Sequence, residues 1–483
     1  MIDTEDSIMR SVAIFFYSIF LLVNGPVCAD QDSIPSNAIK EELKLFDIWV
    51  GNQMIDREQP GLSIGVVHNG ELIWDKSYGF SDIAKLVPAT SQTLYRIASI
   101  SKTFTATAIL QLRDAGKLKL TDPVHNHLPW FQLDSEQSKP ITIWHLLSHT
   151  SGLPREPAGL NWSDLVMPSR AAMIDRIGEQ QPVFVPETEW KYSNLAFALA
   201  GEIVASASGQ SWEEYIQENL LNPLEMASTV IAPTRSQPML ATGYQRRALG
   251  EPRATRPWID TGAVRPAGNL ASNVEDLARY LVFHLSKGDE LLSEASRKEM
   301  HRVHWLLDSW KQGWGLGFQV LRKADYNLAG HGGSLPGYRT SFAFSPEYDL
   351  GIVVLTNADD GAPTEYRDMA FDLLIPAIQR AESVNIDEID SGLSRYVGKY
   401  SDPNREMSVL IYKGGLVAVG HSLANPAKSL IELQRVGEHS FEAHPTAMHY
   451  WANGQVFQFI IGDEGQAVEM RTDFLTLKHI DEP

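Results

Sequence analysis

The polar, acidic stretch over residues 383–391 most constrains the fold of this chain, because it separates two parts of different texture. Before it, strand-like runs flank a long middle part of helices and loops, and an amphipathic segment follows at Thr364 to Arg380. After it, short strand-like runs alternate with turn residues, the pattern of a small β-barrel or sandwich. With 483 residues, the chain is too long for one ordinary domain. We therefore predict an α/β domain over 30–382, a linker over 383–391 and an all-β domain over 392–483.

Local signals predict the elements of the large domain. Leu62 to Val67 and Leu72 to Tyr78 flank an Asn-Gly pair, which is a strong hairpin signal. Ser99 opens a predicted helix that runs to about Ala115 and is closed by Gly116. Further strands are expected at residues 315–321, 339–345 and 351–356.

Residues 1–29 have the composition of a secretory signal. Ser11 to Val23 is nearly all apolar, follows Arg10 and leads to a small-residue cleavage site after Ala29. Cys28 is the only cysteine. A lipid-bearing Cys28 is the alternative, but Gly25-Pro26-Val27 is a poor approach to such a site. We predict removal of the signal, leaving a secreted or periplasmic chain that has no disulfide and no membrane association.

The net charge and the spacing of the histidines limit which partners the protein can bind. The net charge of -19 argues against nucleic acid, which requires clustered Lys and Arg. His125 with His127, and His301 with His304, lack the carboxylates or cysteines that would complete a metal site, so no metal is predicted. A small molecule or a peptide is the expected partner, and the oligomeric state is left open.

Ser99 and Lys102 form a Ser-x-x-Lys motif at a predicted helix start. Residues i and i+3 share a helix face, so the Lys102 amine can reach the Ser99 hydroxyl, and a helix N-terminus favours developing negative charge. A serine hydroxyl needs a neighbouring base to act as a nucleophile. Lys102 can be that base where burial or nearby positive charge lowers its pKa. An ordinary surface lysine is the alternative, because about one such match is expected by chance.

Two later motifs complete a possible site for covalent catalysis. Tyr192-Ser193-Asn194 precedes an apolar helical run, Leu195 to Ala205. Here Tyr192 would relay a proton to the leaving group, and Asn194 would orient Lys102 and bind a substrate amide. His331-Gly332-Gly333-Ser334 lies between strand-like segments, and its glycines would let a substrate backbone approach closely. A packing tyrosine and a plain Gly-rich turn are the alternatives.

Together these motifs resemble those of the serine β-lactamase and penicillin-binding-protein superfamily, in particular class C β-lactamases, D-aminopeptidases, esterases and linear-peptide hydrolases. Further matching stretches are Leu146-Leu147-Ser148-His149-Thr150-Ser151-Gly152-Leu153-Pro154, Trp190-Lys191 before Tyr192, Pro266-Ala267-Gly268 and Pro336-Gly337-Tyr338. The likeness runs from about residue 38 to 382. The segment from about 392 resembles the lipocalin-like β-domain appended to some of these enzymes.

The resemblance implies an α/β fold in which the N- and C-terminal segments of the domain share one antiparallel sheet, with a helical subdomain between them. It implies Ser99 as nucleophile, Lys102 and Tyr192 as acid and base, and Asn194 as the residue that positions them. The oxyanion hole would consist of the backbone N–H groups of Ser99 and Ser334. Such donors are worth roughly 3–4 kcal/mol each in hydrolases. No cofactor is implied.

One departure narrows the expected activity. His331-Gly332-Gly333 stands where β-lactamases and many penicillin-binding proteins have Lys-Thr-Gly, and His331 carries a charge only part of the time near neutral pH. His331 and Gly333 would still contact the substrate, as in peptidase and esterase relatives. We predict a serine hydrolase of peptide bonds, acting on peptides with D- or modified residues, such as linearised microcystins. A carboxylesterase is the alternative, then a β-lactamase, and a catalytically silent binding protein is the alternative from another class.

Two other features are interpreted as structural. Gly61-Leu62-Ser63-Ile64-Gly65 matches the nucleophile-elbow pattern, but that elbow requires a strand leading into a helix, and Ser63 lies in a predicted hairpin strand. Trp305, Trp310, Trp314 and Phe318 are expected to pack in the core. A less favoured interpretation has one of them wall an apolar substrate pocket.

Overall fold

The computed structural model describes residues 35–133, 139–248, 251–323, 326–381, 391–445 and 452–480. The predicted signal over 1–29, with Cys28, lies outside the described residues, as does the predicted linker apart from Ser391. Among the described residues, no helix is long and apolar enough to cross a membrane.

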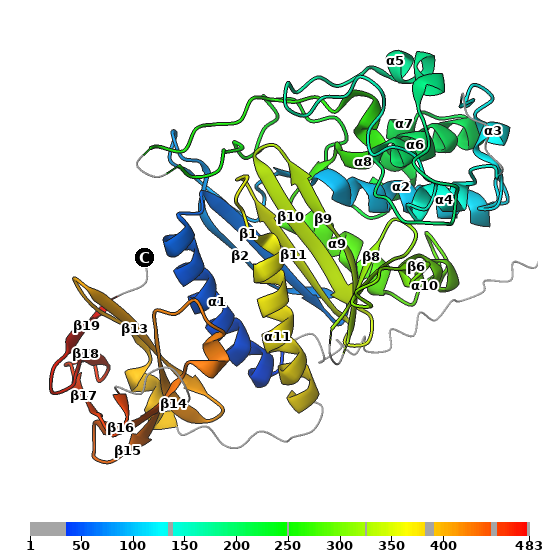
Figure 1. Ribbon diagram of the computed structural model, residues 1–483. Coiled ribbons are helices and arrows are strands. Elements are labelled where there is room, and N and C mark those ends of the chain that lie inside the picture. Colours follow the sequence, from blue (N-terminus) through cyan, green and yellow to red (C-terminus); the bar gives the residue numbers. More distant parts are fainter. Residues whose placement is uncertain are drawn as a thin grey trace, which may run out of the picture. The chain divides into compact units, whose positions relative to one another are not determined.

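The large domain is built on a nine-stranded antiparallel sheet with the order β3-β2-β1-β11-β10-β9-β8-β7-β6 (Figure 1). Its strands are β1 (Gly61–His68), β2 (Glu71–Asp82), β3 (Val87–Pro88), β6 (Trp305–Leu306), β7 (Gln312–Trp314), β8 (Gln319–Arg322), β9 (Asn327–Leu335), β10 (Tyr338–Ser345) and β11 (Leu350–Thr356). The predicted hairpin is β1–β2, and β1 also pairs with β11. The first and last strands of the domain thus meet at the centre of the sheet, as the resemblance implied.

Helices cover both faces of this sheet, whose central strands are buried along almost their whole length. On one face lie α1 (Asn37–Arg57) and α11 (Pro363–Ala381), which share one apolar cluster with β1 and β11 (Figure 1). The other face carries a larger apolar core with α9 (Val274–Leu285) and the helical subdomain. The remaining helices are α2 (Ser101–Asp114), α3 (Val124–His127), α4 (Ile143–Leu147), α5 (Arg170–Asp175), α6 (Asn194–Ser208), α7 (Trp212–Ile216), α8 (Arg265–Gly268) and α10 (Glu294–His301), and β4 (Tyr95–Arg96) pairs with β5 (Ala271–Ser272).

Two boundaries differ from the sequence prediction. The strand expected over 315–321 is β8 and begins only at Gln319. The His331-Gly332-Gly333-Ser334 motif lies inside β9, not between strands. Glycine usually weakens a strand interior. Gly330 and Gly333 are nevertheless required here, because a Cβ would come within 2.1 Å of Phe342 O at Gly330 and within 2.3 Å of Ile97 O at Gly333.

The C-terminal part forms a closed eight-stranded barrel, which resolves the choice between barrel and sandwich. Its strands are β12 (Gly398–Asp402), β13 (Arg405–Tyr412), β14 (Gly415–Gly420), β15 (Ile431–Arg435), β16 (Ser440–Pro445), β17 (Val456–Ile461), β18 (Ala467–Arg471) and β19 (Thr476–Ile480). A cluster of buried side chains that includes Tyr396, Tyr400, Phe441 and Phe459 forms its core. The fold is therefore α/β with an all-β C-terminal domain of the lipocalin-like type.

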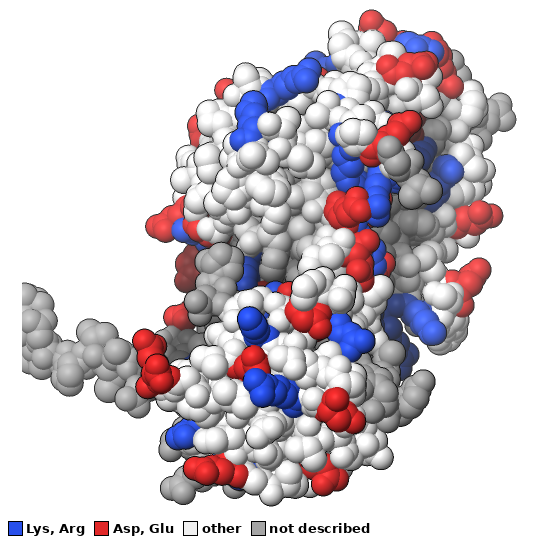
Figure 2. Space-filling model, turned by 90° about the vertical axis from the view of Figure 1, so that its left-hand side faces the viewer, with Lys and Arg blue, Asp and Glu red and all other residues white. Residues whose placement is uncertain are grey.

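Charged side chains of both signs are interspersed over the face shown in Figure 2. Among the described residues on that face, neither Lys and Arg nor Asp and Glu form a continuous patch. This distribution differs from the basic stripe with which proteins follow a nucleic-acid backbone.

Candidate active site

Ser99 lies in a single 3-10 turn, Ala98–Ile100, directly before α2. The α-helix itself starts at Ser101, two residues later than predicted. Ala98 has a φ of +48°, a left-handed conformation that is uncommon for a residue with a side chain. Such a residue stores about 1–3 kcal/mol of strain, which the surrounding structure has to hold. The turn brings Ser99 to the wall of a cleft between the sheet and the helical subdomain.

Lys102 is the second residue of α2, three residues after Ser99, and is completely buried. Its Nζ is 3.2 Å from Ser99 Oγ, 2.7 Å from Asn194 Oδ1 and 2.7 Å from the carbonyl oxygen of Ala267. Burial holds the pKa of Lys102 well below its usual range; the Glu156 carboxylate opposes this shift and Arg155 adds to it. The burial predicted as the condition for a lysine base is therefore present.

The partners of Lys102 identify the atom that faces Ser99. Asn194 Oδ1 and Ala267 O are acceptors only, so each takes one N–H of the amine. A neutral amine has two N–H groups and one lone pair. With both N–H groups engaged, the lone pair remains for the Ser99 hydroxyl.

Tyr192 and Asn194 are held at the start of α6. The Ser193 hydroxyl caps this helix by accepting the N–H of Ala196, so α6 begins at Asn194. Tyr192 hydrogen-bonds to Ser99, and Lys102 Nζ lies 4.8 Å from the centre of its ring. Burial raises the pKa of Tyr192 above its usual range, while the Ser99 hydrogen bond and then Arg155 act in the opposite direction. The phenol therefore stays protonated at neutral pH.

Sequence reasoning missed the two charged residues behind Asn194. The Glu156 Oε1 atom accepts from Asn194 Nδ2 at 2.8 Å and from Trp162 Nε1 at 2.9 Å. The Arg155 guanidinium lies 5.1 Å from the centre of the Tyr192 ring. Both residues directly follow the matching stretch that ends at Pro154. This position in the sequence could have marked them as neighbours of the site.

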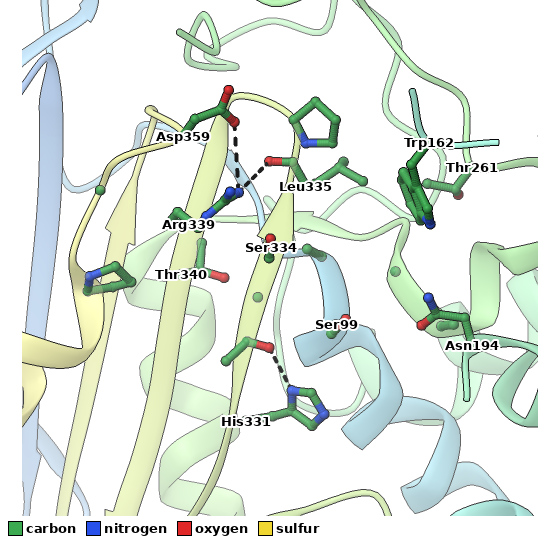
Figure 3. A pocket seen from close by; sticks show the side chains of 18 of the residues that line it. Ser99, Trp162, Asn194, Thr261, His331, Ser334, Leu335, Arg339, Thr340 and Asp359 are labelled. Atoms are coloured by element: carbon green, nitrogen blue, oxygen red, sulfur yellow. Dashed lines mark hydrogen bonds and ion pairs between the residues drawn. The ribbon is translucent and has the colours of Figure 1, made fainter. Parts of the chain in front are cut away.

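His331 points into the cleft from β9 (Figure 3). Burial, followed by the nearby charge of Lys102, lowers the pKa of His331 to about 3. Its Nδ1–H donates to the carbonyl oxygen of Gly332 at 2.6 Å. His331 is therefore neutral at ordinary pH, which corrects the expectation of a partial charge.

The strand edge that carries Gly333 and Ser334 is open. Strand β8 pairs with β9 only as far as Gly330, and residues 331–335 pair with β10 on the other side. The Ser99 turn lies against this edge because Gly333 leaves room for Ile97. Ser334 lines the same cleft as Ser99, as the proposed oxyanion hole requires (Figure 3).

The cleft that contains these residues has a volume of about 1190 Å³. Trp190 and Trp314, which stack at 5.0 Å, wall it near Tyr192. The less favoured interpretation of the tryptophan run thus applies to Trp314. Phe318 is buried in the core, as expected, whereas Trp310 is 68% exposed and does not pack there.

The structure also shows the surroundings of Ser63 and of the histidine pairs, which the sequence did not assign to a site. Ser63 lies inside β1, fully buried and hydrogen-bonded to Ser77 and Tyr95. His301 bonds to His284, and His127 bonds to Asp122. Within the described ranges, no group of three or more His, Cys, Asp or Glu side chains is arranged to hold a metal ion.

An antiparallel sheet covered by helices, with a Ser-x-x-Lys turn against one strand edge, defines the class of serine acyl-transfer proteins with a β-lactamase fold. A sequence model of the Beta-lactamase family matches residues 46–375, and the chain belongs to that family. Membership supports serine hydrolase or acyltransferase activity in general.

Known proteins agree with this assignment. Protein flp of Staphylococcus aureus (strain MW2) is 31% identical over 309 residues, which are 62% of this chain and 59% of that protein, so the chain spans less than two thirds of this relative. Beta-lactamase-like protein 2 of Dictyostelium discoideum is 28% identical over 77% of this chain and 70% of its own length. The octameric penicillin-binding protein homologue from Pyrococcus abyssi has the same fold, with a TM-score of 0.63, 24% identity and coverage of 90% of this chain and 99% of its own.

Proposed function

We propose that this protein hydrolyses amide bonds of peptides through an acyl-enzyme on Ser99. The observation that carries the proposal is the environment of Lys102. Its two N–H groups are used by Asn194 and Ala267, its lone pair is left for the Ser99 hydroxyl, and burial favours the neutral amine. A base in this state can take a proton from serine.

Acylation would proceed with the following proton balance. Ser99 Oγ attacks the substrate carbonyl carbon while its proton passes to Lys102, and the carbonyl oxygen becomes an oxyanion. The N–H groups of Ser99 and Ser334 are the proposed donors to that oxyanion. When the C–N bond breaks, the departing amine takes the Tyr192 phenol proton, and Tyr192 recovers one from Lys102. Water then attacks the ester with the same groups acting in reverse.

The proposed substrates are peptides, with D- or modified residues and linearised microcystins among the candidates. The cleft volume of about 1190 Å³ exceeds the 300–1,000 Å³ typical of small-ligand pockets and suits an extended chain. The open edge of β9 offers unpaired backbone groups to such a chain. The stacked Trp190 and Trp314 would contact an apolar side chain.

A carboxylesterase is the second candidate, and the neutral His331 favours it over a β-lactamase. A histidine with a pKa of about 3 gives no cation for the carboxylate that lies beside a β-lactam ring. The alcohol of an ester leaves without prior protonation more readily than the amine of an amide does. An esterase would therefore depend less on Tyr192.

Product analysis of the protein without its first 29 residues tests the proposal. We expect cleavage of peptides from a panel of L- and D-peptides, simple esters and one penicillin, and a loss of at least about 10⁴-fold in turnover for Ser99→Ala. Ser101→Ala is a matched control. Ser101 lies two residues after Ser99, is buried, and its hydroxyl oxygen accepts the N–H of Leu270. Turnover that survives Ser99→Ala contradicts the nucleophile, and cleavage of esters alone replaces the peptidase by the esterase.

A further inference from the structure

Arg96 is a buried cation near Ser99 to which the proposed reaction gives no role. It lies on β4, three residues before the nucleophile, and is 1% exposed. Within the described part of the chain, its guanidinium bonds to neutral oxygen atoms and forms no ion pair with a carboxylate. A cation removed from water without a paired charge bears a desolvation cost, so its remaining contacts should have a purpose.

The contacts of Arg96 all lie on one segment, residues 258–269. Its Nη1 donates to the carbonyl oxygen of Ile259 at 2.5 Å, and its Nη2 donates to Asn269 Oδ1 at 2.9 Å. The Trp258 ring lies 4.5 Å from the guanidinium carbon. Burial lowers the pKa of Arg96 to about 10, so the side chain is charged at neutral pH. One arginine therefore binds both ends of this segment.

Asn269 extends the hold of Arg96 to the middle of the segment. Its Oδ1 also accepts the Thr261 hydroxyl at 2.8 Å, and its Nδ2 donates to the carbonyl oxygen of Ile231 at 3.0 Å. Both ends of the amide are thus engaged. Thr261 lines the cleft, so the segment that Arg96 holds is part of the cleft wall (Figure 3).

The same segment provides an acceptor for the catalytic base. The carbonyl oxygen of Ala267 accepts from Lys102 Nζ at 2.7 Å, and that of Pro266 accepts the Thr105 hydroxyl at 2.7 Å. Both carbonyl groups belong to α8, which is a single helical turn. One turn is not stable by its own hydrogen bonds, so contacts from outside decide where it lies.

The direction of the Lys102 lone pair depends on the position of Ala267 O. The two N–H groups of the neutral amine are fixed by Asn194 Oδ1 and Ala267 O. If either acceptor moves, the amine turns, and its lone pair no longer faces the Ser99 hydroxyl.

We propose that Arg96 is a positioning residue for proton transfer, which fixes the 258–269 segment so that Ala267 O orients the Lys102 amine towards Ser99. A planar guanidinium suits this task because its N–H groups point in fixed directions and hold two acceptors at a set separation. A lysine at this position has the charge but not the fork. The inference rests on the proposed function, because it concerns the same base and nucleophile.

Labelling with an alkyl fluorophosphonate tests the inference without peptide turnover. Ser99 Oγ bonds to phosphorus, the P–F bond breaks, fluoride leaves, and the hydroxyl proton passes to Lys102. The labelling rate, followed by mass spectrometry, should reach a plateau where Lys102 is neutral and fall at lower pH. In Arg96→Lys we expect a plateau about 10- to 100-fold lower, because the base is misplaced. The acid limb should move to lower pH, because a carbonyl acceptor favours the charged amine.

Arg297→Lys is the matched control. Arg297 is 2% exposed, donates to the carbonyl oxygens of Leu292, Ser286 and Gly288, and lies outside the cleft. Its plateau and acid limb should match those of the wild-type protein. Asn269→Ala removes one acceptor of Arg96 and should give the same two changes at a smaller size, so it replaces Arg96→Lys if that variant does not fold.

Three results would overturn the inference. The first is an unchanged plateau in a folded Arg96→Lys protein. The second is a lower plateau with an unmoved acid limb, because Arg96 then supports the Ser99 turn and not the Lys102 amine. The third is an equal loss in Arg297→Lys. Labelling of Ser99 in a wild-type protein that cleaves no peptide would instead contradict the proposed hydrolysis, and the labelling rates of the variants would still decide the role of Arg96.

Discussion

The two ends of the cleft contain different kinds of basic side chain. Around Lys102, burial lowers the pKa of the amine, His331 has a pKa of about 3, and stacked indoles form the wall. Beyond Ser334, the guanidinium groups of Arg256 and Arg339 lie beside the Asp359 carboxylate. One end therefore holds a group that can give up its proton, and the other holds permanent cations.

The difference follows from residue type as much as from burial. Desolvation disfavours the charged form of every base, but lysine and histidine release a proton within reach of neutral pH, whereas arginine does not. Proton transfer requires the first kind of group and anion binding requires the second. The Lys102 end therefore has the kind of basic group that proton transfer requires, and the Arg339 end has the kind that stays charged.

Of the predicted substitutions, Lys102→Met should lower activity most. Lys102→Met keeps the length of the side chain and removes the lone pair that faces Ser99, so kcat should fall by about 10⁴-fold for all substrates. Steady-state kinetics on a peptide and an ester measures the change, with Lys117→Met, at an exposed site, as the control. A loss confined to acidic peptides would mean that Lys102 binds substrate and is not the base.

Tyr192→Phe should have the next largest effect and should depend on the leaving group. Removing the phenol that hydrogen-bonds to Ser99 should lower kcat/KM for amides by about 10²- to 10³-fold, and less for activated esters, because a departing amine needs a proton. The comparison of ester and amide rates measures it. Equal losses on both substrates would remove Tyr192 from the role of acid.

The sequence predicted the parts of the site that depend on local spacing. Ser99 lies three residues before Lys102, at the start of α2, and Ser193 caps α6, so Tyr192 and Asn194 flank a helix start that the sequence marks. The all-β character of the C-terminal part also followed from its short strands and turns. The closure of these strands into a barrel depends on the pairing of β12 with β19 from the two ends of this part, which the spacing of strands and turns does not predict.

What the sequence could not predict depends on contacts between distant segments. His331 is neutral because distant residues, among them Tyr192 and Trp314, pack around it, and no local sequence pattern predicts that burial. Position 333 of β9 requires glycine because Ile97, far away in the chain, leaves no room for a side chain. Arg256, Arg339 and Asp359 come from three segments that meet only in the folded domain.

The smallest predicted effect concerns the charges next to the base. Glu156 and Arg155 are adjacent in the chain and have opposite effects on Lys102. The Glu156 carboxylate raises the pKa of Lys102, and the Arg155 guanidinium lowers it. Because the neutral amine is the active form, kcat/KM should fall as the pH drops through the pKa of Lys102. Glu156→Gln keeps the hydrogen bond from Asn194 and removes the charge, so this acid limb should move to lower pH by about one unit or less. Arg155→Gln should move it to higher pH.

The control for these shifts is Glu202→Gln. Glu202 is as shielded as Glu156, at 14% against 16% exposure, and pairs with Arg170 outside the cleft. Its pH profile should match that of the wild-type protein. Shifts of the same sign for Glu156→Gln and Arg155→Gln would mean that these residues act through structure and not through charge. Opposite shifts would show that the proton affinity of Lys102 is set by the fixed charges of Glu156 and Arg155.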